Sequence, residues 1–581
     1  MPVPARGVEY QPWRWCMLNP ISPGDVRAGG RITDNVRYVC SCADCMALGY
    51  GCSCGALDAC GNASYAFNAY YQVHGQVESA CDFQGIAVIV HVDASQGVCN
   101  FSVQLVGAIE LPIKSTTLSF SFGHEKWASP FSPASSVPRS PSGCFREGTV
   151  EDGTNGDTAD DHYHRYMEDI DLIHSLGVNS YRFSIAWARI LPKGRFGHVN
   201  PDGVAFYNAL IDALLQRGIE PFVTISHYDI PYELEKRYGG WLSPEIRRDF
   251  GYLADVCFRM FGDLVKFWIS FNEPNIFAKL SYIYGRYPRG HCSRPFGNCT
   301  SGNSSTEPYI AGHNMGKQGG HIGITVLSRW YEPFRNIPTD ILAVDRGLSF
   351  GAPWFLDPII LGDYPSAMHK ILGPNLPEFT SKQKKILQAS KLDFIGLNHY
   401  STSYLKDCIS SSPCELDPFD GDARISTSTE RDGILIGERT GLPYLNTVPY
   451  GMEKMVMYYK RRYNNTPMYI TENGYAQASN SNMSAKDFTN DTGRVDYLQG
   501  YLTFLASAIR KGADVRGYFV WSLLDNFEWN SGYTQRFRLY HVDYKTQKRT
   551  PKLSAKWYSE FLKGSPLRIW SQNGNSYKYS A

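Results

Sequence analysis

The chain has 581 residues, of which 57 are lysine or arginine and 56 are aspartate or glutamate, giving a formal net charge of +1. This balance does not support a nucleic-acid or anionic-membrane partner, and no apolar run is long enough to span a bilayer. Residues Met1–Trp15 contain no apolar core of a secretory signal. Length and composition predict a globular chain of two or more domains, or one large barrel with an appendage.

Cysteines crowd the N-terminal part of the chain, with nine of the 15 before residue 100. Such crowding is typical of a small scaffold cross-linked by disulfides, or of a zinc site. Cys42 and Cys45 form one Cys-x-x-Cys pair, but no matching second pair follows, which favours disulfides and an oxidising compartment. Because nine is odd, at least one thiol is left over. The nine are Cys16, Cys40, Cys42, Cys45, Cys52, Cys54, Cys60, Cys81 and Cys99.

The composition changes after about residue 105. Residues 129–142, SPFSPASSVPRSPS, are rich in proline and serine and contain little to bury, as in a linker. We therefore expect three parts: a small disulfide-rich module over residues 1–105, a linker over 106–147, and a larger domain over 148–581.

Short apolar runs alternate with longer amphipathic stretches from about residue 148 onward. The runs are mostly unbroken, as buried parallel strands should be, and helical stretches such as Asp161–Leu176 and Ala205–Arg217 lie between them. This alternation predicts an α/β fold with a parallel sheet and crossover helices. Seven strands are recognisable, whereas a closed (β/α)8 TIM barrel needs eight. They are Ser180–Trp187, Glu220–Asp229, Phe267–Pro274, Gly323–Ser328, Leu392–Tyr400, Met468–Asn473 and Val515–Asp525.

Polar residues cluster where these predicted strands end. Asn272–Pro274 ends one strand, and Thr471–Gly474 ends another. In a barrel such ends converge on one face, where active sites form, so that Glu273 and Glu472 would face each other. A pair of carboxylates is the apparatus for glycoside hydrolysis. One must be a protonated acid and the other an ionised nucleophile, so their surroundings must separate their pKa values.

The strings Asn272-Glu273-Pro274 and Ile470-Thr471-Glu472-Asn473-Gly474 resemble the two catalytic signatures of glycoside hydrolase family 1, the β-glucosidases. Either string alone is a weak signal, but both, in order and at predicted strand ends, are a strong one. The resemblance covers about residues 148 to 570 and is greatest to the plant members. It implies a (β/α)8 TIM barrel acting on a small-molecule β-glucoside, and we expect no cofactor and no metal ion.

By this resemblance, Glu273 is the acid/base and Glu472 is the nucleophile, so that a covalent glucosyl-enzyme forms and configuration is retained. Asn272 would hold the sugar 2-hydroxyl. Arg182 would lie against the nucleophile and Tyr400 would donate a hydrogen bond to it, which favours the ionised carboxylate. The other sugar-pocket residues that the resemblance implies are His227, Trp521, Glu528, Trp529 and Phe537, with Tyr444 on the aglycone side.

Two later cysteine pairs, Cys292 with Cys299 and Cys408 with Cys414, resemble disulfides of the plant family, and free buried thiols are the alternative. Seven Asn-x-Ser/Thr sequons accompany them. Together these features favour a secretory history, and the resemblance implies the extracellular space, cell wall or vacuole as destination. The sequons begin at Asn62, Asn100, Asn298, Asn303, Asn464, Asn482 and Asn490.

The N-terminal segment carries a second resemblance. Ala63–Asn68 (ASYAFN), Tyr70–Gln72 (YYQ) and Cys81–Gly85 (CDFQG) resemble a plant family 43 carbohydrate-binding module, which implies binding of β-1,3-glucan. Six of the nine cysteines fit that pattern, whereas Cys42, Cys52 and Cys60 are extra, so the disulfide pairing stays open. A stapled module that binds no glucan is the alternative.

The family pattern fails at the first barrel strand, which in the enzymes carries a sugar-binding glutamine followed by a Trp-Asp segment. The resemblance resumes only at Gly148–Gly153, GTVEDG. Leu118–Gly123, LSFSFG, could imitate the first strand, but no matching glutamine follows it. We therefore expect this strand to be missing or replaced, with a loss of sugar binding in the transition state. One hypothesis is that a glucanase-type tail and a truncated glucosidase were joined in one gene model.

The sequence thus predicts a retaining β-glucosidase that hydrolyses terminal β-D-glucosyl residues from small, aromatic glucosides. Two alternatives stay open: a catalytically impaired relative that only binds sugars, and a cell-wall β-glucan-binding protein that works through the N-terminal module.

Overall fold

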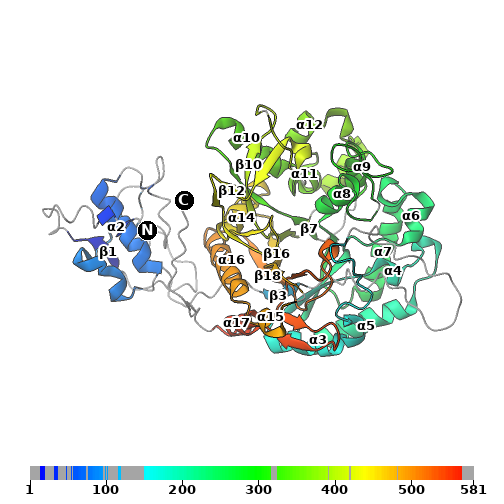
Figure 1. Cartoon of the computed structure of the whole chain (residues 1–581), viewed down its shortest axis with the longest axis horizontal. Helices are drawn as coiled ribbons and strands as arrows, with labels where there is room; N and C mark the ends of the chain where they lie inside the picture. Colours follow the sequence, from blue (N-terminus) through cyan, green and yellow to red (C-terminus); the bar gives the residue numbers. More distant parts are fainter. Residues whose placement is uncertain are drawn as a thin grey trace. The chain divides into compact units, whose positions relative to one another are not determined.

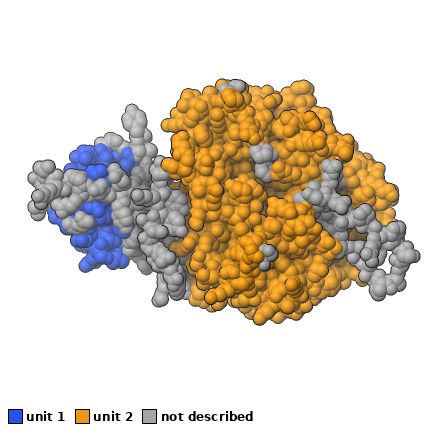
Figure 2. Space-filling model, viewed as in Figure 1, with its two compact units in different colours: residues 1–110, 566–581 blue, residues 111–565 orange. Residues whose placement is uncertain are grey.

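The computed structural model describes residues 14–19, 32–33, 35–36, 39, 48, 54, 57–73, 76–95, 99, 101, 115–119 and 150–564, except 289, 316–322, 390–391, 412, 418–419 and 481. The chain divides into two compact units, Met1–Glu110 with Pro566–Ala581 and Leu111–Ser565 (Figure 2). None of the helices in these ranges combines the length and the apolar character that a bilayer crossing requires.

The N-terminal unit is an antiparallel strand pair and a helix held by disulfides. β1 (Trp15–Leu18) pairs with β2 (Ala87–Val90), and α2 (Ala59–Val73) packs against β1. Disulfides join Cys16 to Cys81 and Cys54 to Cys99. The predicted disulfide-rich module is thereby confirmed. Two short 3-10 turns lie between α2 and β2, over Glu78–Cys81 and Phe83–Gly85.

The described residues of this unit form a small core. Phe67 and Tyr71 of α2 are fully buried beside the Cys16–Cys81 disulfide, and the Phe67 and Phe83 rings stack with centroids 4.2 Å apart. A core of this size supplies little stability, which is why small domains carry covalent cross-links. Cys60 is an exposed free thiol, as an odd cysteine number requires. Four of the nine cysteines lie outside the described residues, namely Cys40, Cys42, Cys45 and Cys52.

The larger unit is built around a closed parallel barrel with helices outside it (Figure 1). All seven strands predicted from the sequence are present in it, and the predicted (β/α)8 TIM barrel is confirmed. In barrel order the strands are β16 (Met468–Asn473), β18 (Val515–Trp521), β3 (Ser115–Ser119), β4 (Ser180–Ser184), β5 (Glu220–Ser226), β6 (Phe267–Asn272), β7 (Gly323–Leu327) and β9 (Ile395–Asn398).

The eighth strand of the barrel is β3, which pairs in parallel with β18 on one side and β4 on the other. The first strand is therefore replaced rather than missing. Five residues of the range 106–147, which the sequence predicted to be a linker, form this barrel strand. The predicted candidate Leu118–Gly123 shares only Leu118 and Ser119 with β3. Closing the barrel requires a strand between β18 and β4, because their edges would otherwise be unpaired. The segment that pairs with both of them is therefore the one that forms the strand.

Helices follow the strands as the alternation predicted. α3 (His162–Leu176) and α5 (Pro201–Gln216) correspond to the two expected helices. α5 begins with a regular cap, since Asn200 accepts from the Asp202 N–H at 3.3 Å and Pro201 occupies the first turn. The other helices described in this unit are α4 (Trp187–Ile190), α6 (Tyr232–Tyr238), α7 (Ile246–Phe261), α8 (Pro274–Tyr282), α9 (Glu307–Met315), α10 (Pro338–Ser349), α11 (Pro353–Leu361), α12 (Ser366–Leu372), α13 (Ser381–Ala389), α14 (Tyr450–Arg462), α15 (Ala485–Thr489), α16 (Thr492–Arg510) and α17 (Leu553–Leu562).

Aromatic side chains fill the interior of the barrel near the amino ends of its strands. The Phe222 ring lies 5.4 Å from Phe394, 5.1 Å from Tyr469 and 5.0 Å from Phe519, between ring centroids. These rings belong to one buried cluster. The barrel is thus a packed core at this end, which leaves its opposite end for the pocket.

The segments that connect or follow the barrel strands form several small sheets. The largest joins β8 (Trp330–Pro333), β10 (Thr402–Asp407) and β11 (Ile425–Ser428). The two-stranded ones pair β12 (Glu430–Arg431) with β13 (Ile434–Leu435), β14 (Glu438–Arg439) with β15 (Asn446–Thr447), β17 (Gln477–Ala478) with β19 (Gln535–Arg536), and β20 (Tyr540–Val542) with β21 (Arg549–Pro551).

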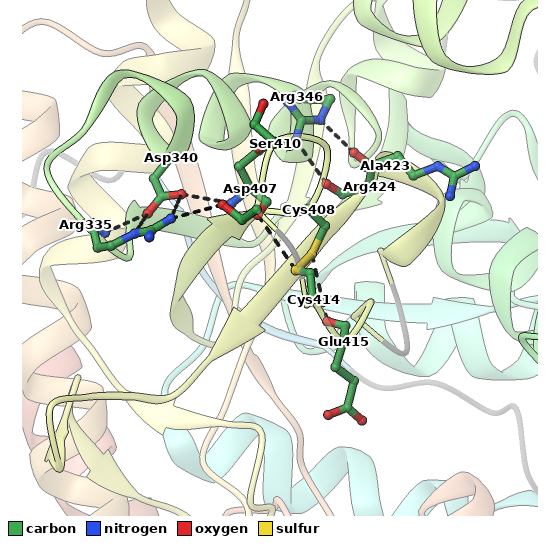
Figure 3. Close-up of a disulfide and its surroundings, with 11 residues drawn as sticks. Arg335, Asp340, Arg346, Asp407, Cys408, Ser410, Cys414, Glu415, Ala423 and Arg424 are labelled. Atoms are coloured by element: carbon green, nitrogen blue, oxygen red, sulfur yellow. Dashed lines mark hydrogen bonds and ion pairs between the residues drawn. A yellow bond between two sulfur atoms is a disulfide. The ribbon is translucent and has the colours of Figure 1, made fainter.

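Both cysteine pairs of the larger unit are disulfides, as the resemblance implied: Cys292–Cys299 and Cys408–Cys414. The second follows β10 directly and lies beside two ion pairs whose carboxylates are buried, Arg346–Asp407 and Arg335–Asp340 (Figure 3). There Asp407 accepts from Arg346 Nη2 at 2.6 Å, and its N–H donates to Asp340 at 3.0 Å. The cross-link and the ion pairs fix the same loop. Cys257 is a buried free thiol.

The loop after β18 is fixed by a buried carboxylate. Asp525 accepts from Lys552 Nζ at 2.9 Å and from Arg536 Nη1 at 2.7 Å. These cations hold the pKa of Asp525 far below its usual range despite its burial. The ionised group ties the residues that follow β18 to β19 and to the start of α17, and so positions the loop that carries Glu528 and Trp529.

Candidate active site

The carboxyl ends of the barrel strands bring the two predicted carboxylates into one pocket. Glu472 lies in β16, and Glu273 follows β6 directly, before the first residue of α8. Both side chains are buried and line a pocket of about 180 Å³. This convergence is the property of parallel barrels on which the sequence prediction depended.

Glu472 lies against a cation. Arg182 Nη1 of β4 donates to Glu472 Oε1 at 2.6 Å, and the Tyr400 hydroxyl donates to Oε2 at 2.7 Å. Burial raises the pKa of Glu472, and the charge and hydrogen bond of Arg182 oppose that rise. A carboxylate with a cation on one oxygen and a phenol on the other is held in one orientation and favoured in its ionised form.

Glu273 has neutral partners instead. Asn398 Nδ2 donates to Glu273 Oε1 at 2.7 Å, and the Tyr228 hydroxyl donates to Oε2. Burial, followed by the charge of Glu472, raises the pKa of Glu273 to about 7. The backbone of Glu273 has a φ of 43°, in the left-handed region that residues with a side chain seldom adopt. Such conformations persist mainly where function requires them.

Asn272 connects the two carboxyl groups. Its Oδ1 accepts from Arg182 Nη2 at 2.6 Å and from Asn398 Nδ2 at 3.2 Å. Its Nδ2 lies 3.0 Å from His227 Nε2, which fits an imidazole that accepts at that nitrogen. The predicted residues Arg182, Asn272 and His227 thus belong to one buried hydrogen-bonded network.

Aromatic rings form one wall of the pocket. The His227 ring stacks at 5.8 Å from Trp529 and at 6.1 Å from Trp521, between centroids. Tyr287 stacks on Trp529 at 5.6 Å. Aromatic and apolar side chains with a few polar groups beside them are the usual lining of a small-molecule pocket.

Glu528 lines the same pocket and is backed by a buried arginine. Arg538 has no exposed side-chain surface and forms an ion pair with Glu528 Oε2. Its guanidinium also lies 5.3 Å from the Trp521 ring centroid and 5.8 Å from that of Phe537. The buried cation Arg538 therefore lies next to three predicted sugar-pocket residues, namely Glu528, Trp521 and Phe537.

All the predicted substrate-binding residues but one line the pocket surface. Arg182 is the exception, because it lies behind Glu472 and is fully buried. Tyr444 is also at the pocket but has 43% of its surface exposed, which places it at the open side.

Sequence reasoning missed several residues of the site. Tyr228 and Asn398 contact the carboxyl of Glu273, and both lie in the last residues of predicted strands, Glu220–Asp229 and Leu392–Tyr400, where the strand-end rule applies. Arg329 lines the pocket one residue beyond the predicted strand Gly323–Ser328, where the same rule applies. The strand-end rule could not find Arg538, because this residue follows β19, well beyond the end of the last barrel strand, β18.

Comparison with protein-family models gives two matches. The glycosyl hydrolase family 1 model matches residues 142–565, and the X8 domain model matches residues 14–88. The family 43 assignment of the N-terminal segment is not tested by this match and stays a prediction.

The curated relatives include plant β-glucosidases. A protein of Oryza sativa subsp. japonica named probable inactive β-glucosidase 14 is 69% identical over 439 residues, covering 73% of this chain and 85% of that protein. The coniferin β-glucosidase of Pinus contorta is 49% identical over 435 residues, covering 71% and 84%.

Solved structures of β-glucosidases share the fold. The rice Os3BGlu6 β-glucosidase superposes with a TM-score of 0.70 at 39% identity, covering 77% of this chain and 98% of that one. The enzyme of the fungus Humicola insolens in complex with glucose gives a TM-score of 0.71 at 35% identity, covering 79% and 99%. The family model spans most of the chain and these relatives agree with it: the chain belongs to glycosyl hydrolase family 1.

Proposed function

We propose that this protein is a retaining β-glucosidase, with Glu472 as the nucleophile and Glu273 as the acid/base. The observation that carries the proposal is the different surroundings of two buried carboxyls in one pocket. Arg182 and Tyr400 hold Glu472, whereas Glu273 has no cationic partner among its hydrogen bonds and a pKa of about 7. Surroundings that place a cation against one carboxyl and only neutral hydrogen-bond donors against the other are what the nucleophile and acid roles require.

In the first step, an oxygen of Glu472 attacks the anomeric carbon while Glu273 gives its proton to the glycosidic oxygen. The bond to the leaving group breaks and a covalent glucosyl-enzyme forms. In the second step, Glu273 takes a proton from water, and the hydroxyl displaces Glu472, so configuration is retained overall. A solved mutant of the rice enzyme Os3BGlu6 is described as a covalent complex with Glc, which supports this order.

Recognition of a neutral sugar is supported by Glu528. Its carboxylate lines the pocket and would accept from sugar hydroxyls, while a 6-phosphate would meet its negative charge. Residues 115–123, STTLSFSFG, contain no glutamine, so in this proposal His227, Asn272 and Glu528 supply the contacts to the hydroxyls.

An aromatic aglycone is supported by the open side of the pocket. Tyr228, Tyr287 and Tyr444 line the pocket together with apolar side chains such as Leu442 and Leu445, and Tyr444 is 43% exposed. Because rings of this kind stack favourably on other rings, aryl glucosides are the proposed substrate class. The name of the Pinus contorta relative makes coniferin a test substrate beside p-nitrophenyl β-D-glucoside.

The proposal is tested by incubating the purified chain with p-nitrophenyl β-D-glucoside. We expect release of p-nitrophenol, and proton NMR of the early reaction should show β-glucose before mutarotation produces the α anomer. Formation of α-glucose first would contradict the retaining mechanism.

The alternative of a catalytically impaired protein is favoured by one observation, the name of the rice relative at 69% identity. The two functions give different results in the same experiment. An impaired protein would release no aglycone from any aryl glucoside, yet would bind glucose-like inhibitors in the pocket, as measured by calorimetry.

For the N-terminal unit we propose binding to cell-wall β-1,3-glucan, supported by its match to the X8 domain and by its resemblance to family 43 modules. The disulfides and the sequons likewise support the proposal that the protein passes through the secretory pathway.

The full chain should therefore sediment with insoluble β-1,3-glucan, and soluble laminarin should release it. Cellulose and xylan serve as control polysaccharides. A version with both Cys16 and Cys81 replaced by serine should bind less, because the small unit loses a cross-link that closes a long loop. Equal sedimentation with all polysaccharides, or with none, would contradict the proposal.

A further inference from the structure

Tyr228 and Asn398 each donate a hydrogen bond to the carboxyl group of Glu273. The phenol hydroxyl donates to Glu273 Oε2, and the Asn398 amide donates to Glu273 Oε1 at 2.7 Å. The proposed function uses Tyr228 only as one of the rings that line the pocket and gives no role to its contact with Glu273.

The two partners determine which oxygen carries the acid proton. An amide N–H2 group can donate but cannot accept, so the oxygen that faces Asn398 Nδ2 has to be the unprotonated one. The proton of Glu273 is therefore on Oε2, the oxygen that Tyr228 contacts. A phenol can both donate and accept, so Tyr228 suits Oε2 in either protonation state.

Tyr228 is held rigidly in this position. Its ring packs against Trp529 at 5.0 Å and against Phe277 at 5.8 Å, between centroids. Its backbone φ is 74°, again in the left-handed region, where a side chain costs free energy. Burial, together with the charge of Glu273, keeps the pKa of Tyr228 far above its usual value, so the phenol stays protonated.

We propose that Tyr228 is a positioning residue that holds Glu273 Oε2 toward the leaving group and stabilises the charge that appears there when the proton leaves. This inference rests on the proposed function, because it assigns Glu273 the acid/base role.

The proton balance is closed within each turnover. In the first step the Oε2–H bond breaks, an O–H bond to the leaving oxygen forms, and the new negative charge on Oε2 accepts from the Tyr228 hydroxyl. In the second step a water O–H bond breaks, and its proton returns to Oε2. Tyr228 keeps its own proton throughout and only reorients its hydrogen bond.

In the part of the chain that the structure describes, other charged or titratable groups interact with Glu273, and Tyr228→Phe changes none of them. They are Glu472, Arg182, Tyr287 and Tyr400. A donor to the ionised form lowers a carboxyl pKa, so removal of the Tyr228 hydroxyl alone should raise the pKa of Glu273.

The test is Tyr228→Phe in the full chain. The basic limb of the pH profile of kcat/KM should move upward by about half a unit to one unit. For phenyl β-D-glucoside, whose leaving group needs acid assistance, kcat/KM should fall about tenfold, the effect of losing one hydrogen bond to a charged group. For 2,4-dinitrophenyl β-D-glucoside, whose leaving group needs little assistance, it should change less than about twofold.

Tyr469→Phe is the matched control, since it removes a phenol from the aromatic cluster at the other end of the barrel. It should leave both the limb and the ratio between the two substrates unchanged. An unshifted limb in Tyr228→Phe, or an equal loss on both substrates, overturns the inference while the proposed function stands.

A second measurement does not depend on activity. Carbon-13 NMR titration of glutamate-labelled protein, with Glu273→Gln to assign the signal, gives the pKa of Glu273 directly with and without the Tyr228 hydroxyl. A pKa that rises in Tyr228→Phe supports the inference, and an unchanged pKa overturns it. If wild-type protein releases no aglycone at all, the proposed function fails, and this titration still decides the role of Tyr228.

Discussion

Replacing Glu472 with glutamine is expected to lower kcat/KM for p-nitrophenyl β-D-glucoside by at least about 10,000-fold. The amide has nearly the same shape as the carboxylate but is a far weaker nucleophile. It also leaves Arg182 Nη1, now 2.6 Å from Glu472 Oε1, without the charge that balances it. The measurement is the rate of p-nitrophenol release by purified wild-type and variant chains at the same pH.

Two controls make this result specific. Glu168→Gln makes the same chemical change on α3, where the side chain is 64% exposed, and should leave the rate unchanged. Thermal unfolding should show that Glu472→Gln is folded at the assay temperature despite the loss of a buried ion pair. A 2-deoxy-2-fluoroglucosyl inhibitor should add its sugar to the peptide that carries Glu472. Labelling of another peptide, or a variant with more than about one hundredth of wild-type activity, would contradict the assignment.

The sequence predicted the two carboxylates and seven strands because both leave local signals. A buried parallel strand is an unbroken apolar run, and the polar residues that follow it mark the face where the pocket forms. Glu273 and Glu472 could be placed in one site by that rule alone, without knowledge of any side-chain contact.

The eighth strand could not be predicted in the same way. Ser115–Ser119 reads STTLS, a short polar string with one apolar residue, next to a segment rich in proline and serine. Its strand conformation is selected by pairing with β18 and β4, which are far away in the sequence. Local propensity is a weak guide where such long-range pairing decides the outcome.

The family resemblance implied Arg182 and Tyr400 as the partners of Glu472, but the partners of Glu273 and Glu528 were beyond sequence reasoning for a different reason. Tyr228 stands directly after the predicted site residue His227, yet it reaches Glu273 because its backbone adopts a positive φ. Arg538 reaches Glu528 through the path of the loop after β18, which depends on the buried ion pairs of Asp525. Such contacts follow from tertiary structure and leave no periodic pattern in the chain.

Replacing Glu273 with glutamine should remove acid assistance while leaving the nucleophile in place. For phenyl β-D-glucoside we expect kcat/KM to fall by about 100- to 10,000-fold, the usual contribution of a general acid. For 2,4-dinitrophenyl β-D-glucoside the first step should persist, so a burst of dinitrophenol precedes a slow steady state, because water then lacks its base. Stopped-flow absorbance measures both phases, and Glu168→Gln again serves as the matched variant.

The pH profile separates this role from a merely structural one. Glu273 must be protonated to act as an acid and has a pKa of about 7, so wild-type kcat/KM should decline as the pH rises through that value. Glutamine does not titrate, so the decline should disappear in Glu273→Gln. Added azide, a nucleophile that needs no base, should restore turnover of the dinitrophenyl substrate and yield β-glucosyl azide. A decline that persists in the variant, or azide without effect, would show that another group is the acid/base.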